Sequence, residues 1–287
     1  MTPRSQFTLG DIFRISLAAY RQRFRSLMGI SLVFLLPFDI INAYVQSRFL
    51  DAGRLPANWM TKVQEAHSLS EALSAIPQAY TTWMPFVLTL YSLVVLPLMA
   101  VATSRVTVGM VVHGFDVPVQ EAGNDAFRKW PMSFATLLMV DLLYFIAALV
   151  ASWVIGLCAG IAASASQALA AIIAVVGLLA AFAGSVWYWV RAAFVPYVIA
   201  EEKRGYATAL RRSFELTKGE VWRLIGFFLV LSFLLSAADG FLLLVGSVFA
   251  WIPGLGIVVA VVASLIVVPF GFVAVAVMYV DLRMRKA

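Results

Sequence analysis

The sequence has few charged residues and few of the side chains that build most catalytic and metal sites. Only 13% of its 287 residues are charged, and it holds one cysteine and two histidines. The lone Cys158 excludes an internal disulfide and every multi-cysteine metal motif. His67 and His113 belong to no metal-ligand pattern, and no phosphate-binding Gly-x-x-x-x-Gly-Lys loop or Gly-x-Ser-x-Gly motif is present. We therefore expect no catalytic residue, no metal site and no cofactor, and we predict that the protein is not an enzyme.

Apolar residues dominate the chain instead. They make up 62% of it, and the mean hydropathy is +0.92, well outside the range of soluble domains. Because a helix rises about 1.5 Å per residue, roughly 20 apolar residues cross a hydrocarbon core of about 30 Å. Six stretches meet this length: 27–46, 82–104, 132–157, 167–190, 222–250 and 257–280. We predict an all-α polytopic membrane protein whose six transmembrane helices form three hairpins.

A polar, amphipathic segment precedes each predicted hairpin. The first covers about 9–24, after a Thr8-to-Asp11 helix start, and the second covers 116–130. The third is the charged stretch 201–223, in which Thr217 and Glu220 repeat the helix-start pattern and would begin the fifth span. The chain is then a single membrane domain, 1–287, with an internal repeat over 8–104, 116–190 and 206–281. Alternatively, any membrane hairpin with a basic interface would look this way.

The distribution of basic residues predicts the orientation. In this topology, Arg48, Arg54 and Lys62 are the only Lys and Arg residues on the side opposite the two termini, out of 21 in the chain. Since Lys and Arg near spans stay on the cytoplasmic side, we expect a multi-pass protein of a bacterial inner membrane with both termini cytoplasmic. The net charge of +6 then indicates that the basic residues contact membrane lipids, including anionic headgroups, and not nucleic acid.

Each predicted hairpin carries one aspartate in its first helix: Asp39, Asp141 and Asp239. A carboxylate in hydrocarbon is costly and normally faces a partner or a water-filled cavity. The spacing from the preceding basic or aromatic residues places Asp141 near mid-membrane and the other two near the outer headgroups. Asp141 is therefore either a structural hydrogen-bond acceptor or a group that helps move a proton or polar solute.

The basic stretch offers a candidate surface for lipid headgroups or a partner protein: Arg211, Arg212, Lys218, Trp222 and Arg223. The alternative is that these side chains only retain the loop in the cytoplasm and snorkel. A Gly156-x-x-x-Gly160 spacing permits close helix packing, in ordinary contacts or in a dimer.

Residues 195–202, Val-Pro-Tyr-Val-Ile-Ala-Glu-Glu, are followed by Ala-Leu-Arg-Arg-Ser-Phe-Glu-Leu-Thr-Lys-Gly at 209–219 and by Trp222-Arg223. This pattern resembles the central signature of the glycerophosphoryl diester phosphodiesterase membrane domain family, bacterial six-span proteins, and the resemblance extends over most of the chain. Some members carry a fused soluble phosphodiesterase barrel. This chain has no such barrel, so the resemblance implies no phosphodiesterase activity.

We expect a non-enzymatic integral membrane protein that acts in envelope or lipid homeostasis or as a scaffold. The lipid role is what the family resemblance implies. The alternative is a small transporter or channel subunit with Asp141 on its pathway, and a lipid-modifying enzyme would need a site hidden in the loop 48–81. Expected partners are membrane lipids and a partner membrane protein or a second copy of this chain.

Overall fold

The computed structural model describes residues 7–49, 85–114, 117–248 and 255–286, together with the isolated residues Thr61 and Glu65. These residues form helices and no strand. Six of the described helices are long and apolar enough to cross a membrane. The prediction of an all-α, polytopic membrane protein is therefore confirmed. Arg54, Lys62 and His67, and the start of the second span at Thr82, lie outside the described residues.

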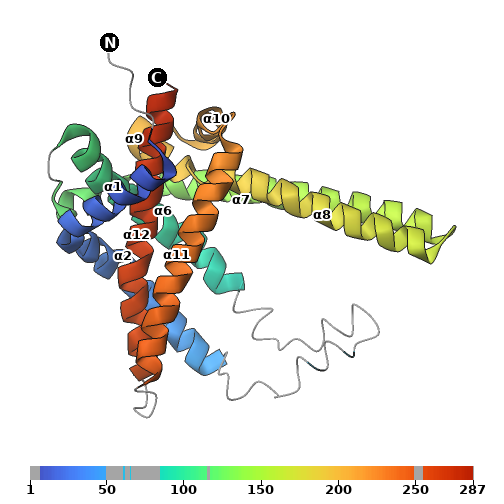
Figure 1. Cartoon of the computed structure of the whole chain (residues 1–287), viewed down its shortest axis with the longest axis horizontal. Helices are drawn as coiled ribbons and strands as arrows, with labels where there is room; N and C mark the ends of the chain where they lie inside the picture. Colours follow the sequence, from blue (N-terminus) through green and yellow to red (C-terminus); the bar gives the residue numbers. More distant parts are fainter. Residues whose placement is uncertain are drawn as a thin grey trace.

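The helices are continuous over most of the described chain (Figure 1). They are α1 (Leu9–Gln22), α2 (Phe24–Phe49), the π-helical segment η2 (Tyr91–Val95), α6 (Leu96–Val108), the π-helical segment η3 (Gly109–His113), α7 (Val119–Ala163), α8 (Gln167–Ala192), α9 (Val195–Glu202), α10 (Tyr206–Leu216), α11 (Val221–Ser247) and α12 (Leu255–Arg285). The second predicted span corresponds to helical residues from Pro85 to Val112, which include η2 and α6.

The predicted helix start at Thr8 is confirmed. The Thr8 hydroxyl accepts a hydrogen bond from the Asp11 N–H at 3.2 Å, and the Asp11 carboxylate accepts one from the Thr8 N–H at 3.1 Å. The Thr8 hydroxyl also donates to the Asp11 carboxylate at 2.7 Å, and this bond and the one from the Thr8 N–H hold the pKa of Asp11 below its ordinary value. Ile12, Ser16 and Ala19 are buried, and α1 packs on α12. The amphipathic helix α1 therefore turns its apolar side toward the protein.

The predicted helix start at Thr217 is wrong. The helix α11 begins at Val221 after Glu220, and no side chain caps it. The Thr217 hydroxyl instead donates a hydrogen bond back to the Ser213 carbonyl at 2.9 Å. The Thr217 N–H donates to the same carbonyl at 3.1 Å, so the backbone and the side chain of Thr217 together close the last turn of α10. The predicted third span, 132–157, lies inside α7, one helix of 45 residues that also holds most of the predicted segment 116–130. The start of the span at Met132 stays a prediction.

Tertiary contacts explain why α7 continues through Pro131. A proline inside a helix removes one N–H and usually breaks or kinks the helix. Here Ala122, Ala126 and Lys129 are buried just before the proline. The Lys129 ammonium donates a hydrogen bond to the Ala200 carbonyl of α9 at 2.6 Å. Packing of this first part of α7 on α6 and α9 thus outweighs the loss at the proline.

Two pairs of long helices leave the body of the molecule in different directions. The helices α11 and α12 run side by side, whereas α7 and α8 run side by side at a steep angle to them (Figure 1). Large apolar side chains along the α7–α8 pair, such as Phe145, Leu178 and Phe182, are exposed. These side chains form a surface suited to lipid chains. The arrangement as three hairpins and the internal repeat stay predictions.

The two ends of the described chain, at Phe7 and in the last turns of α12, lie together. The Phe7 N–H donates a hydrogen bond to Asp281 at 3.2 Å, and Arg223 joins the first turn of α11 to the same carboxylate at 2.7 Å. Asp281 is 1% exposed and also accepts from Arg285 at 2.9 Å. Both ends of the described chain therefore lie at one end of the helical body. We call this end, where α1, α9, α10 and the last turns of α12 meet, the polar end.

Candidate functional site

Two irregular helices open a space in the middle of the molecule. The segment η2 is π-helical, a form that is rare and often found at functional sites. The helix α12 contains Pro269, which cannot donate a backbone hydrogen bond. Gly271 follows it, and a Cβ there would lie 3.2 Å from Leu235 of α11. Tyr91 and Ser92 of η2 and Gly271 of α12 line the same gap between the helices.

A cavity of about 930 Å³ occupies this gap. Its wall combines residues of the second span, α7, α8, α9, α11 and α12. Most of the wall is apolar, including Leu137, Phe182, Leu231 and Phe272. The hydroxyl groups of Ser92, Tyr144, Ser185, Ser232 and Tyr197 interrupt it. A large apolar cavity with a few polar groups is the usual form of a small-molecule site.

Asp141 lies in this wall, at the position that the sequence predicted to be deep in the membrane. It is the only aspartate, glutamate, lysine, arginine or histidine among the described residues that line the cavity. Among the described residues, its carboxyl group makes no hydrogen bond or ion pair. The nearby Tyr188 hydroxyl donates to the Val140 carbonyl at 2.8 Å instead. Asp141 could act as a structural acceptor only if another helix supplied a hydrogen-bond donor. No residue of the described chain supplies one.

Aromatic rings stand beside this carboxyl group. The rings of Tyr144 and Tyr188 stack with their centroids 5.6 Å apart, and the Tyr144 ring lies 5.2 Å from that of Trp189. The Tyr144 hydroxyl donates to Ser185 across the α7–α8 contact at 3.0 Å. This bond and the stacked rings fix the position of α8 next to Asp141. The cavity wall around the carboxyl group is thus built from both helices of the pair.

The other two intramembrane aspartates lie elsewhere. Asp39 is 9% exposed between α2 and α12, where it accepts a hydrogen bond from Ser264. The sequence placed it near the outer headgroups; the structure buries it because α12 packs on α2 and supplies the serine donor. Asp239 is partly exposed on α11 and makes no hydrogen bond or ion pair with any described residue. Neither aspartate lines the cavity.

The five residues of the predicted headgroup or partner surface divide into two groups. Arg211, Lys218 and Trp222 are exposed, Arg211 at 84% and Trp222 at 86%. Arg212 and Arg223 are engaged inside the protein. The Arg212 Nε lies 3.1 and 3.0 Å from the two carboxylate oxygens of Glu202. Arg223 is bound to Asp281 and donates to the Phe7 carbonyl at 2.8 Å. Only the exposed group presents its side chains outward.

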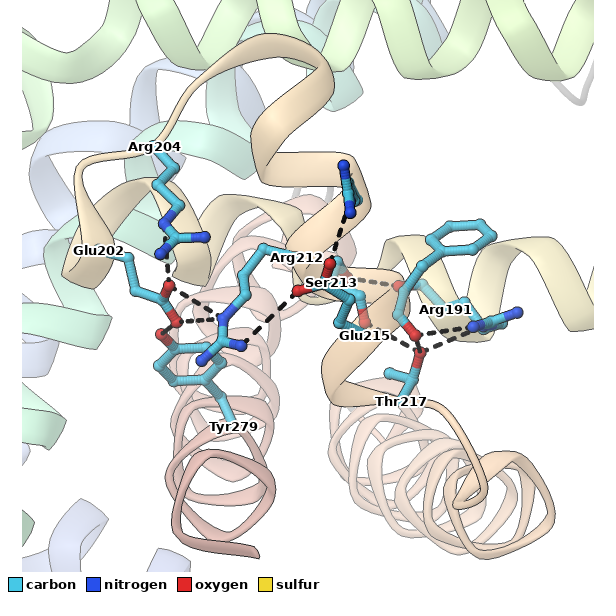
Figure 2. A network of polar contacts seen from close by, with 10 residues as sticks. Arg191, Glu202, Arg204, Arg212, Ser213, Glu215, Thr217 and Tyr279 are labelled. Carbon is cyan, nitrogen blue, oxygen red and sulfur yellow. Dashed lines mark hydrogen bonds and ion pairs between the residues drawn. The ribbon is translucent and has the colours of Figure 1, made fainter. Parts of the chain in front are cut away.

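Figure 2 shows the network that holds α10 at the polar end. Glu202, at the end of α9, contacts Arg204, Arg212 and the Tyr279 hydroxyl, the last at 3.2 Å. Arg191, at the end of α8, donates to Thr217 at 3.2 Å and to the Phe214 carbonyl at 2.7 Å. Its guanidinium also lies 4.6 and 4.3 Å from the ring centroids of Trp187 and Phe214. The segments that carry the family resemblance, α9 and α10, are therefore fastened to α8 and α12.

Sequence reasoning identified Asp141 but missed its surroundings. Tyr144 lies three residues further along α7, on the same helix face, so this spacing could have pointed to it. Ser185 and Ser232 come from other helices, and no spacing along the chain links them to Asp141.

Comparison of the chain with family models, with curated proteins and with solved structures finds no match. The resemblance to the glycerophosphoryl diester phosphodiesterase membrane domain family therefore stays a prediction made from the residues. Within the described part of the chain, no three His, Cys, Asp or Glu residues gather as metal ligands would.

Proposed function

We propose that this protein is a non-enzymatic integral membrane protein that binds an amphipathic, lipid-like molecule in the cavity beside Asp141. The cavity itself is the observation that carries the proposal. Its volume of about 930 Å³ falls within the range of roughly 300–1,000 Å³ found for ligand sites. Its apolar wall suits a hydrocarbon chain, while Asp141 and the hydroxyl groups suit a polar head.

The position of the cavity supports a ligand that comes from the membrane. Its walls belong to helices that are long and apolar enough to span a bilayer. Residues of α7, α8, α11 and α12 all line the cavity, and the α7–α8 pair diverges from the α11–α12 pair (Figure 1). We propose that acyl chains enter the cavity from the lipid between the two pairs. We further propose that the protein lies in a bacterial inner membrane with both termini cytoplasmic. A role in lipid or envelope homeostasis is what membership in the resembled family would imply.

A blocked cavity tests this function. Ser232 lines the cavity, and the neighbouring Phe233 is 74% exposed and does not. Ser232→Trp should place a bulky ring in the cavity and narrow it, and Phe233→Trp is the matched control on the same helix. Both variants and the wild type would be purified in a gentle non-ionic detergent, and the bound lipid would be identified and counted by native mass spectrometry. We expect bound lipid to fall only in Ser232→Trp; equal lipid in all three proteins would contradict the proposal.

A second candidate function, a small transporter or channel subunit, rests on the same carboxyl group. An unpaired acid in a cavity among spanning helices is typical of a polar pathway. Reconstituted vesicles separate the two candidates. A transporter moves solute or protons across the vesicle membrane, and Asp141→Asn should abolish this flux. A wild-type protein that retains its lipid but shows no flux for any tested solute would leave the binding function alone.

A further inference from the structure

We propose that the ligand of the cavity carries a cationic head, an amine or a quaternary ammonium group, and that Asp141 is its counter-ion. This inference rests on the proposed function and names the chemical class of the bound amphiphile. It starts from an imbalance of charge in the wall. One carboxyl group is present, and no lysine, arginine or histidine accompanies it among the described lining residues.

One arginine that is adjacent in the sequence to two wall residues does not itself line the cavity. Arg191 stands between Val190 and Ala192, both of which line the wall. Its guanidinium binds Thr217 and the Phe214 carbonyl and lies over two aromatic rings (Figure 2). The protein therefore does not use this arginine to neutralise Asp141. An unpaired acid in an apolar site is stabilised either by a proton or by a cation, and a cationic ligand would supply the partner that the wall lacks.

The aromatic groups of the wall favour the same class of head. A cation is attracted to the face of a tyrosine or tryptophan ring, most strongly where water is excluded. Tyr144 and Trp189 both line the cavity and lie next to each other, three and 48 residues after Asp141 in the chain. The hydroxyls of Ser185 and Ser232 can accept hydrogen bonds from an ammonium group. An anionic phosphate head would instead meet the Asp141 carboxylate and the negative faces of these rings.

Three amphiphiles with one chain and different heads test the inference: 11-bromoundecyl amine, 11-bromoundecanol and 11-bromoundecyl phosphate. Bromine quenches tryptophan fluorescence at short range, and Trp189 in the wall is the reporter, assigned by loss of the signal in Trp189→Phe. Titrations would use the full chain in a non-ionic maltoside micelle. We expect the amine to bind roughly 30-fold more tightly than the alcohol, the effect of one buried charge pair, and the phosphate to bind most weakly.

Two aspartate variants locate the effect. Asp141→Asn should bring the affinity for the amine down to that for the alcohol, whereas Asp239→Asn, a change in another spanning helix, should not. Asp141→Glu should retain the preference for the amine. Equal binding of amine and alcohol by the wild type, or tighter binding of the phosphate, overturns the inference without any variant. So does an Asp141→Asn protein that still prefers the amine.

The same titrations separate this inference from the proposed function. Binding of the neutral alcohol that Ser232→Phe abolishes, a bulky change that adds no second tryptophan to the wall, would support the cavity as an amphiphile site whatever the amine does. Absence of quenching by all three amphiphiles would overturn both proposals. A cationic preference that disappears in Asp141→Asn supports both.

Discussion

Arg211 and Arg212 are adjacent in the sequence, yet their removal should have very different consequences. Arg212 contacts both oxygens of Glu202, whose side chain is 9% exposed, at 3.0 and 3.1 Å. Removing one partner of a buried ion pair costs about 3–5 kcal/mol. Since Arg204 at 3.4 Å and Tyr279 at 3.2 Å would still contact Glu202, we expect the lower end, about 3 kcal/mol, for Arg212→Gln.

Arg211 provides the control. It pairs with Glu215 at 3.1 Å, but its side chain is 84% exposed and that of Glu215 is 48% exposed. Exposed pairs four residues apart in a helix contribute about 0.5 kcal/mol or less, so Arg211→Gln should hardly change the free energy of unfolding. The two substitutions are chemically identical and lie in the same helix. Their difference therefore measures the effect of burial.

Unfolding in mixed micelles, titrated with dodecyl sulfate and followed by circular dichroism, gives both free energies. A double-mutant cycle with Glu202→Gln should then show a coupling of about 2 kcal/mol for the Glu202–Arg212 pair. The reasoning would be refuted by equal losses in the Arg211 and Arg212 variants. It would also be refuted if the effects of Glu202→Gln and Arg212→Gln were simply additive.

Three further changes test the packing, the topology and the first helix cap. A Cβ at Gly177 would lie 2.8 Å from a side chain of α7, whereas a Cβ at Gly184 on the same helix would meet open space. Gly177→Ala should therefore lower the free energy of unfolding by about 1–3 kcal/mol, and Gly184→Ala should not. Equal stabilities of the two variants would contradict the packing of α7 on α8. Cys158 is exposed, and an impermeant thiol reagent should label it in intact spheroplasts; labelling only in inverted vesicles would reverse the proposed orientation. Because hydrogen bonds from Thr8 lower the pKa of Asp11, the cap stabilises α1 above the ordinary carboxyl pKa of 3.8, and this contribution is lost as the pH falls through the lower, folded value. Thr8→Ala should weaken this pH dependence of the stability, because it removes the hydroxyl donor while the backbone N–H and Arg14 remain, and an unchanged dependence would show that the hydroxyl is not its source.

The sequence was informative where a local pattern determines the outcome. The long apolar stretches predicted spanning helices because an isolated backbone in hydrocarbon must satisfy its hydrogen bonds internally. The Thr8-to-Asp11 start formed as expected because its partners are three residues apart. The same pattern at Thr217 failed, since a preceding helix end competes for the hydroxyl. The polar segment 116–130 and the span from Met132 belong to one helix, α7, because contacts with α9, including the one from Lys129, outweigh the loss at Pro131.

The candidate site was predicted only in part, because local patterns can be read from the sequence and contacts between distant helices cannot. The rarity of acids in apolar helices made Asp141 recognisable. Its lack of a partner could not be known, because partners come from helices distant in the chain. Nor could the sequence distinguish Arg211 from Arg212, although one faces outward and the other binds a buried glutamate.

The sequence by itself determined that this chain is helical, that it enters a membrane, and where its few charges lie along it. Those properties depend on composition and on neighbours within about four residues. Only the tertiary structure decided that the α7–α8 pair leaves the other helices at a steep angle, and that a cavity opens where the pair joins them. It also decided which aspartate is buried against a serine and which faces the cavity, because burial depends on what other helices bring to the same place.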